Sequence, residues 1–342
     1  MAPSILVTGG AGFIGSHTVV ALAEAGYRPV ILDDFSNSDQ RVLKGLETIL
    51  GYEPPCYAQD CNDLPALRRV VQAENIRGAI HFAACKAVGE SMQEPLRYYR
   101  NNLGSLIALM DALLEYGAPD LIFSSSCTVY GEPDQLPVTE NTPVKPAISV
   151  YGNTKQIGEE ILRDTAAAGK ALRSISLRYF NPIGAHSSAQ IGELPLGVPN
   201  NLVPFITQTA AGLRSQLTVF GNDYPTPDGS CIRDYIHVMD LAEAHVAALA
   251  ALEKRPEKCC YEIYNVGAGQ GTSVLELIQT FEAVLGKPLP HRIGDRRPGD
   301  IAAVYADASK IQRELHWTAR RSMRQALEDA WRWELELGKK HH

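Results

Sequence analysis

A glycine-rich turn near the start of the chain constrains the fold more than any other feature of the sequence. Thr8-Gly9-Gly10-Ala11-Gly12-Phe13-Ile14-Gly15 follows the apolar run Ser4–Thr8 and opens a helical pattern at Gly12–Ala25. Glycines at positions 9, 12 and 15 allow a tight turn and a close approach of the backbone to a ligand. The free N–H groups at the N-terminus of the following helix favour an anion. This spacing is typical of a strand–turn–helix unit that binds a dinucleotide.

The rest of the first half alternates between short β-branched runs and longer helical patterns. The predicted strands are Ser4–Thr8, Val30–Asp33, Ala79–Ala83, Leu121–Ser125 and Ser174–Tyr179. The predicted helices between and after them are Gly12–Ala25, Asp39–Leu50, Asp63–Glu74, Pro95–Tyr116 and Val150–Ala168. Alternation at this spacing predicts βαβ units and a parallel sheet. The expected fold class is therefore α/β, a Rossmann-type doubly wound parallel sheet with a smaller α/β substrate-binding lobe.

The alternation of strand and helix patterns ends after Tyr179, where the chain becomes rich in proline, glycine and asparagine. We therefore expect residues 1–180 to form the dinucleotide-binding Rossmann domain, with 236–266 returning to it. Residues 181–235 and 267–342 are expected to form the second lobe. The length of 342 residues agrees with about two domains, because a single core rarely grows beyond ~250–300 residues.

Composition excludes several classes of protein. The net charge of −7 argues against nucleic acid as a partner, and no apolar run reaches the ~18 residues that a membrane span needs. The first residues lack the basic and apolar regions of a secretory signal. Seven cysteines without a Cys-x-x-Cys pair predict reduced thiols, with no disulfide framework and no metal site. We expect a cytoplasmic protein that does not bind membranes.

An acidic pair follows the second predicted strand and indicates which dinucleotide binds. Asp33 and Asp34 lie 18 and 19 residues beyond Gly15, where a carboxylate accepts a hydrogen bond from a ribose 2′-hydroxyl. No Arg or Lys lies between Pro29 and Gln40 to balance a 2′-phosphate. The sequence therefore predicts NAD rather than NADP.

A tyrosine and a lysine begin the helix after the fifth predicted strand. Tyr151 and Lys155 lie four positions apart in the sequence and so share one helix face. An ammonium group beside a phenol favours the phenolate, which can act as a general base. The run Ser124–Ser126 ends the preceding strand, at the edge where open α/β sheets bind their ligands.

These three features together resemble the extended short-chain dehydrogenase/reductase superfamily. Longer blocks narrow the resemblance to the UDP-glucose 4-epimerase family, over residues 4 to about 333. The blocks are Phe82–Ser91, Ser124–Gly131, Arg178–His186, Asn200–Leu202, Phe220–Tyr224 and Arg233–Val238.

The resemblance implies epimerisation at C4 of a UDP-hexose with tightly held NAD. Tyr151 would remove the proton of the 4-hydroxyl while hydride passes from C4 to the nicotinamide, which leaves a 4-keto sugar. Rotation of the sugar and return of the hydride to the opposite face would complete the reaction. Lys155 would tune Tyr151 and bind the nicotinamide ribose, and Ser126 would assist the proton transfer.

The resemblance also implies two sets of binding residues. The cofactor set is Gly9, Gly12, Phe13, Ile14, Gly15, Asp33, Asp34, Phe35, Ser36, Asn37, Ser38, Asp60, Cys61, Phe82, Ala83, Ala84, Lys86, Asn101, Ser124, Tyr151, Lys155, Tyr179 and Phe180. The UDP-sugar set is Lys86, Ser126, Thr128, Tyr151, Asn181, Asn200, Asn201, Leu202, Thr218, Val219, Phe220, Arg233, Tyr235, Arg297, Asp300 and Val304. In the second set, Arg233 and Arg297 would hold the phosphates, because guanidinium groups make bidentate contacts with phosphate.

Val304 departs from the family pattern in an informative way. A bulky Tyr at this position walls the sugar pocket in the family and excludes N-acetylated sugars. The smaller Val304 leads us to expect activity on UDP-GlcNAc and UDP-GalNAc as well as on UDP-glucose and UDP-galactose. The alternative is that Val304 is simply packed in the core.

Three other functions remain open at this stage. A sugar-nucleotide 4,6-dehydratase needs an Asp-Glu pair soon after the site serine, and Ser126-Cys127-Thr128 offers no acid. A UDP-uronate 4-epimerase would need further cations for the 6-carboxylate. A non-catalytic NAD-binding regulator would typically have lost the Tyr–Lys pair, which this chain retains.

An apolar stripe on the predicted helix 95–116 bears on assembly. Leu103, Leu106, Ile107 and Met110 form it. This helix and the helix 150–168 resemble the pair that forms the dimer interface in the family, so we expect a homodimer. The alternative is that the stripe faces its own sheet.

Overall fold

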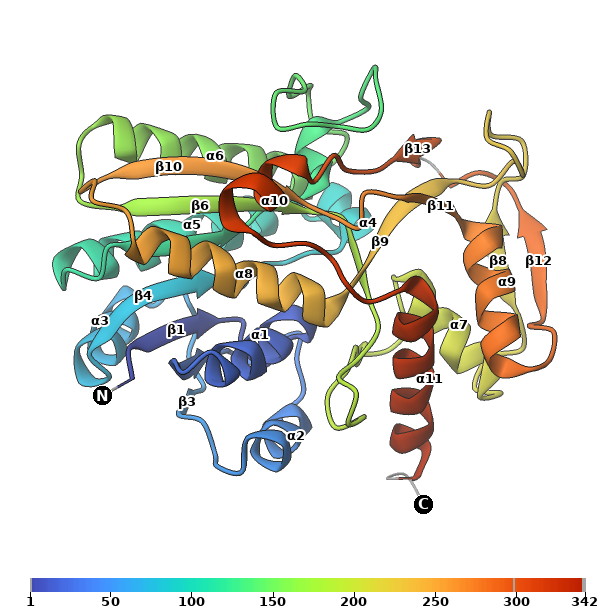
Figure 1. Cartoon of the computed structure of the whole chain (residues 1–342), viewed down its shortest axis with the longest axis horizontal. Coiled ribbons are helices and arrows are strands. Elements are labelled where there is room, and N and C mark those ends of the chain that lie inside the picture. Colours follow the sequence, from blue (N-terminus) through green and yellow to red (C-terminus); the bar gives the residue numbers. More distant parts are fainter. Residues whose placement is uncertain (1, 298, 340–342) are drawn as a thin grey trace.

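A computed structural model describes residues 2–297 and 299–339 and contains a large parallel sheet (Figure 1). Its seven strands follow the order β10-β6-β5-β4-β1-β2-β3, and every neighbouring pair is parallel. They are β1 (Ser4–Thr8), β2 (Arg28–Leu32), β3 (Cys56–Tyr57), β4 (Ile76–His81), β5 (Asp120–Ser124), β6 (Arg173–Tyr179) and β10 (Cys260–Val266). The order reverses between β1 and β4, and ligands bind outside the strand ends at such a switch point. The predicted Rossmann-type α/β fold is confirmed.

Helices cover both faces of this sheet. One face carries α1 (Phe13–Glu24), α2 (Arg41–Leu50) and α8 (Val238–Glu253), and the other carries α3 (Leu64–Ala73), α5 (Pro95–Glu115) and α6 (Val150–Ala167). Successive side chains of β1 serve the two faces in turn: Val7 packs into the first core and Leu6 into the second. In the part of the chain that the structure describes, no helix is both long and apolar enough to cross a membrane.

A second, smaller lobe lies to the right of the sheet in Figure 1. Its strands are β7 (Asn181–Ile183), β8 (Leu217–Phe220), β9 (Ile232–His237), β11 (Gly271–Ser273), β12 (His291–Gly294) and β13 (Ala303–Val304). Its helices are α7 (Leu202–Ala210), α9 (Val274–Leu285) and α11 (Met323–Lys339). A separate apolar core joins β7, β8 and β9 to these helices, with Leu217 and Phe281 buried inside it. The lobe therefore has its own packing and can hold residues opposite the strand ends of the sheet.

The chain passes through this lobe and then returns to the main sheet. After β9, α8 packs against α1, and β10 pairs with β6 along its whole length. Trp317, which follows the short helix α10 (Ser309–Leu315), is also buried in the core of the main sheet. The division into domains stays a prediction, and residues 340–342 of its last segment lie outside the described residues.

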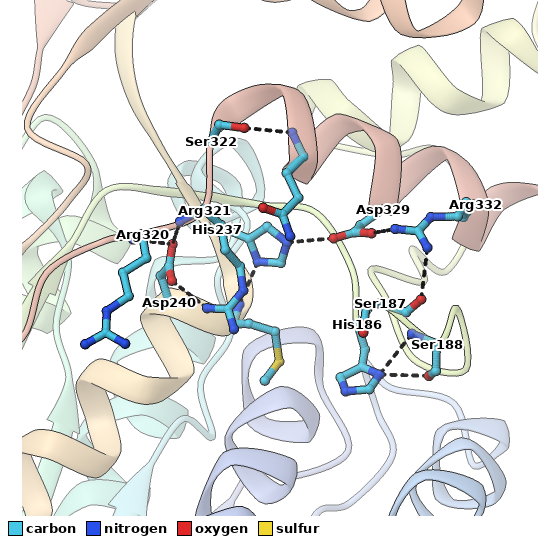
Figure 2. A network of polar contacts seen from close by, with 12 residues as sticks. His186, Ser187, Ser188, His237, Asp240, Arg320, Arg321, Ser322, Asp329 and Arg332 are labelled. Atoms are coloured by element: carbon cyan, nitrogen blue, oxygen red, sulfur yellow. Dashed lines mark hydrogen bonds and ion pairs between the residues drawn. The ribbon is translucent and has the colours of Figure 1, made fainter.

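A polar network fastens the last helix to the start of α8 (Figure 2). The buried carboxylate of Asp329 on α11 contacts His237 Nε2 at 3.1 Å and pairs with Arg332. Asp240, which is fully buried, accepts hydrogen bonds from the backbone N–H groups of Arg320 and Arg321. The segment leading to α11 is thereby held against the helix that packs on α1.

Candidate active site

The glycine-rich turn joins β1 to α1, and its geometry separates the roles of its glycines. Gly9 has φ +70°, and a Cβ on Gly15 would lie 2.2 Å from the Gly9 carbonyl oxygen. The fold itself therefore requires both of these glycines. Gly12 has an ordinary φ of −73°, and a Cβ there would meet only the Gly9 carbonyl, at 3.2 Å. The open space above Gly12 fits a ligand that approaches the backbone closely.

The N-terminus of α1 is suited to the pyrophosphate of a dinucleotide. Its first turn carries no acidic side chain, and no side chain caps it. The N–H groups and the positive end of the helix dipole are thus available to an anion. The residues present fit NAD at this place.

Asp33 ties the glycine-rich turn to the loop that follows β2. Its Oδ2 accepts a hydrogen bond from the Ala11 N–H at 2.9 Å, and its Oδ1 accepts from the Phe35 N–H and the Ser38 hydroxyl at 3.0 and 2.7 Å. A carboxylate offers about four lone-pair positions, so one remains for a ribose hydroxyl. Asp34 is exposed and accepts from Ser36.

The other predicted cofactor residues follow successive strands at the same edge of the sheet. Asp60 and Cys61 follow β3, Phe82 to Lys86 follow β4, Ser124 ends β5, and Tyr179 and Phe180 lie at the end of β6. Asn101 lies on α5. The side chains of Cys61 and Phe180 are buried in apolar cores. Burial leaves little of these two side chains exposed for contact with a cofactor.

Tyr151 and Lys155 lie on the first turns of α6, which Ser149 caps through its hydroxyl. The Lys155 ammonium lies 5.7 Å from the centre of the Tyr151 ring and donates a hydrogen bond to the Ser124 carbonyl at 2.6 Å. The Ser124 hydroxyl is 2.5 Å from the Tyr179 hydroxyl. The structure therefore brings the predicted tyrosine, lysine and serines together beside the switch point.

Burial dominates the protonation of this cluster. It lowers the pKa of Lys155 to about 7, against the opposing charge of Glu159. It also raises the pKa of Tyr151, although hydrogen bonding with the Ser126 hydroxyl opposes the rise. We expected Lys155 to lower the pKa of Tyr151. In the structure the loss of hydration outweighs any such effect, because a buried phenolate is poorly solvated.

The predicted phosphate arginines meet at one carboxylate. Arg297 donates to both oxygens of Asp300, at 3.1 and 2.8 Å, and Arg233 lies 3.6 Å from the same group. The Arg297 guanidinium also lies 5.8 Å from the centre of the Phe220 ring, which is 45% exposed. Two arginines against one carboxylate leave a net positive charge beside an exposed aromatic face, a combination that suits a nucleotide diphosphate.

The remaining predicted substrate residues divide into accessible and buried ones. Lys86, Asn200 and Asn201 are exposed, and Ser126, Thr128, Asn181, Leu202, Thr218 and Tyr235 lie on the elements around Arg233. Thr128 Oγ1 is buried without a hydrogen-bond partner in the described structure, so a ligand hydroxyl can satisfy it. Val219 and Val304 are 2% and 4% exposed and pack into apolar clusters.

Sequence reasoning missed three polar residues that hold the site together. The side-chain amide of Asn102 accepts a hydrogen bond from the Cys85 N–H, and it donates to the Cys85 carbonyl and to the hydroxyl of Thr154 on α6. Glu159 and Arg178 form a buried ion pair directly behind Lys155. The i,i+4 spacing from Lys155 to Glu159 was visible in the sequence. The strand that supplies its partner was not.

Comparison with known proteins agrees with this geometry. The model of the NAD dependent epimerase/dehydratase family matches residues 5–267. The UDP-glucose 4-epimerase of Bacillus subtilis is 50% identical over 331 residues, which are 97% of this chain and 96% of that protein.

Two solved structures have the same architecture. One is a Stenotrophomonas maltophila UDP-glucose-4-epimerase with bound NAD and formylated UDP-arabinopyranose, with a TM-score of 0.95, 47% identity and coverage of 99% of both chains. The other is a Bifidobacterium longum UDP-glucose 4-epimerase in complex with NAD+ and UDP, with a TM-score of 0.93, 44% identity and coverage of 97% and 98%. With a family model over most of its length and relatives this similar, the chain belongs to the NAD dependent epimerase/dehydratase family.

Proposed function

We propose that this protein is a UDP-glucose 4-epimerase that uses resident NAD and inverts C4 of UDP-hexoses. The observation that carries the proposal is the cluster of Tyr151, Lys155 and the Ser124–Ser126 run beside the glycine-rich turn. This cluster faces a second lobe with two arginines and an exposed aromatic ring. The two halves of the site match the two halves of the reaction, redox chemistry at a sugar carbon and binding of a nucleotide diphosphate.

In this mechanism the chain's residues move one proton and hold the sugar. Tyr151 removes the proton of the 4-hydroxyl and later returns it, and the Ser126 hydroxyl stabilises the phenolate by hydrogen bonding. The Lys155 ammonium, fixed on the Ser124 carbonyl, supplies positive charge beside the phenol. NAD, when bound, supplies the acceptor and donor of hydride. The sugar is oxidised to a 4-keto form, rotates in the site, and is then reduced on its other face.

The second lobe supplies affinity and selectivity. Arg233 and Arg297 bind the diphosphate, Phe220 stacks on the base, and the orphan hydroxyl of Thr128 contacts the sugar. Val304 lies on β13 opposite Arg233 of β9 and occupies less volume than an aromatic side chain. We therefore also propose that the sugar pocket admits an acetamido group, so that UDP-GlcNAc and UDP-GalNAc are substrates.

The exposed face of α5 supports the proposal of a homodimer. The predicted apolar stripe does not all face outward, because Leu106 and Met110 are buried in the protein's own core. Leu96 and Ile107 are instead 72% and 46% exposed, and their 11-residue separation places them on one helix face. Two exposed apolar side chains on one helix face fit contact with a second copy of the chain.

One experiment tests the proposed function. The purified protein receives UDP-galactose or UDP-GalNAc in separate reactions without added NAD, and the products are separated by anion-exchange chromatography. Conversion of both supports the epimerase with its open pocket. Conversion of UDP-galactose alone keeps the epimerase and removes the proposal for Val304. Conversion of neither, even with NAD supplied, overturns the function and favours a UDP-uronate or a dehydration reaction.

A further inference from the structure

A buried ion pair lies behind the candidate active site, and the proposed mechanism does not use it. Glu159 and Arg178 are 7% and 3% exposed. Arg178 donates from Nε to Glu159 Oε1 at 2.9 Å and from Nη2 to Oε2 at 2.5 Å. Its guanidinium also stacks on the Tyr130 ring, 4.8 Å from the centre. Two charges taken out of water carry a large desolvation cost that their attraction often does not recover, so stability alone explains the pair poorly.

Each partner of the Glu159 carboxylate is adjacent in sequence to a residue of the site. Glu159 follows Lys155 by one turn on the same face of α6. Oε1 accepts a hydrogen bond at 2.6 Å from the hydroxyl of Ser125, which stands between Ser124 and Ser126. Arg178 precedes Tyr179, whose hydroxyl contacts Ser124. One carboxylate thus fixes the relative positions of α6, β5 and β6 where all three carry site residues.

Glu159 is also the negative charge that faces Lys155. Tyr151 lies on the same helix, where burial raises the pKa of its phenol and so disfavours a negative charge there. His81 on β4 is neutral, since burial and the charge of Lys155 lower its pKa to about 3. From β5, Lys155 meets the Ser124 carbonyl and the Phe123 ring, and β6 contributes Arg178 and the hydroxyl of Tyr179.

We propose that Glu159 is a positioning residue for the Tyr151–Lys155 pair: its carboxylate aligns the helix with strands β5 and β6, and its negative charge lies one helix turn from the Lys155 ammonium. This inference rests on the proposed epimerase function. The carboxylate acts through Lys155 and Ser125 and does not touch the sugar.

A second ion pair, which joins strands β5 and β6, provides a matched control. Asp120 begins β5 and Arg173 begins β6, and they form a bidentate pair at 2.7 and 2.8 Å. The pair is largely buried, with side-chain exposures of 16% for Arg173 and 7% for Asp120. It lies at the opposite end of the strands from the site. Removing its charge tests stability without touching Lys155.

The experiment measures kcat and KM for UDP-galactose against pH in the holoenzyme, for the unaltered protein and for Glu159→Gln, Glu159→Asp and Asp120→Asn. In Glu159→Gln we expect the alkaline limb of kcat to move to lower pH by about one unit, because Lys155 loses its ammonium form earlier. At pH values above the shifted limb, kcat then falls about tenfold, while KM stays nearly constant. Glu159→Asp, which keeps the charge, should keep the limb near its original position. Asp120→Asn should lower only the midpoint of thermal unfolding.

The following results decide whether Glu159 positions the Tyr151–Lys155 pair. An unchanged alkaline limb in folded Glu159→Gln, or an equal shift in Asp120→Asn, overturns the inference. If Glu159→Gln does not fold, the double variant Glu159→Gln/Arg178→Met replaces it, since it leaves no unpaired buried charge. The limb must still move to lower pH in that variant. Absence of turnover in the unaltered protein refutes the proposed function itself, which separates that failure from the failure of the inference.

Discussion

At the scale of single residues, the phenol of Tyr151 lies in surroundings that disfavour its charged form. Burial raises its pKa, and among the described residues the Ser126 hydroxyl and the Lys155 ammonium are nearby groups that stabilise a phenolate. The proposed base is therefore active only while these partners hold their positions. Removing the hydroxyl removes the reaction but leaves the ring and its packing in place.

Tyr151→Phe should consequently lower kcat by about 10³-fold and leave NAD bound, since general acid–base catalysis typically contributes 10²–10⁴-fold. Turnover of UDP-galactose is measured together with the NAD released from the acid-denatured protein after gel filtration. Tyr99→Phe serves as the control, because the Tyr99 hydroxyl contacts Asn153 on α6 and does not face Lys155. Unimpaired turnover in Tyr151→Phe would assign the base to another group.

Val304 provides a test of specificity at the same scale. Val304→Tyr should reduce conversion of UDP-GalNAc by on the order of 100-fold and spare UDP-galactose, because the larger ring fills the space for the acetamido group. Val304→Cys keeps the small volume and should retain both activities. Rates are compared for the two substrates in each variant. Equal loss on both substrates would show that Val304 only fills the core that it shares with Phe180.

The sequence could not show the direction of every side chain among the predicted site residues. Cys61 and Val219 occupy positions that match binding residues of the family, yet both side chains are buried among apolar neighbours. In β8, alternation places Thr218 and Phe220 on the surface and Val219 in the core. Glu159 and Arg178 escaped prediction because their pairing depends on which strand lies under α6, and local spacing does not contain that information.

At the scale of elements, α11 depends on the buried carboxylate of Asp329 (Figure 2). Nδ1 of His237 accepts a hydrogen bond from the Met239 N–H, so Nε2 carries the ring N–H and donates a hydrogen bond to Asp329. Asp329→Ala leaves this buried N–H without a partner and should lower the free energy of unfolding by about 1–3 kcal/mol.

Glu328→Ala is the matched control for this change, because Glu328 makes only a surface ion pair with Arg324 on the same helix. Such pairs contribute about 0–1 kcal/mol. Chemical denaturation followed by circular dichroism measures both variants. Losses of similar size in the two would show that the network does not hold α11.

The elements of the main sheet were predictable, whereas the short strands of the second lobe were not. Strands such as Ser4–Thr8 and helices such as Val150–Ala167 follow from continuous apolar runs and helical periodicity, and the structure agrees within a few residues. The strands β11 and β13 contain only 3 and 2 residues and pair with β9 from distant parts of the chain. Pairing partners create these strands, and no local pattern marks them.

At the scale of the whole molecule, the exposed face of α5 predicts the state of assembly. The double variant Leu96→Glu/Ile107→Glu should be a monomer, because two carboxylates would be buried unpaired between the copies. Sedimentation velocity distinguishes the states. Leu335→Glu on α11, where the leucine is 45% exposed, should remain dimeric. A double variant that sediments like the unaltered protein would exclude this face as the interface.

The return of the chain to its first sheet also sets the order in which the protein can be completed on the ribosome. Strand β6 ends at Tyr179, but its outer neighbour β10 begins only at Cys260, after much of the second lobe has been synthesised. Throughout that interval the N–H and C=O groups along one side of β6 have no partner strand. An open, apolar edge is where nascent chains pair with one another and aggregate. Much of the predicted UDP-sugar set, from Asn181 to Tyr235, is thus synthesised while this edge is open, so substitutions there act on yield as well as on binding.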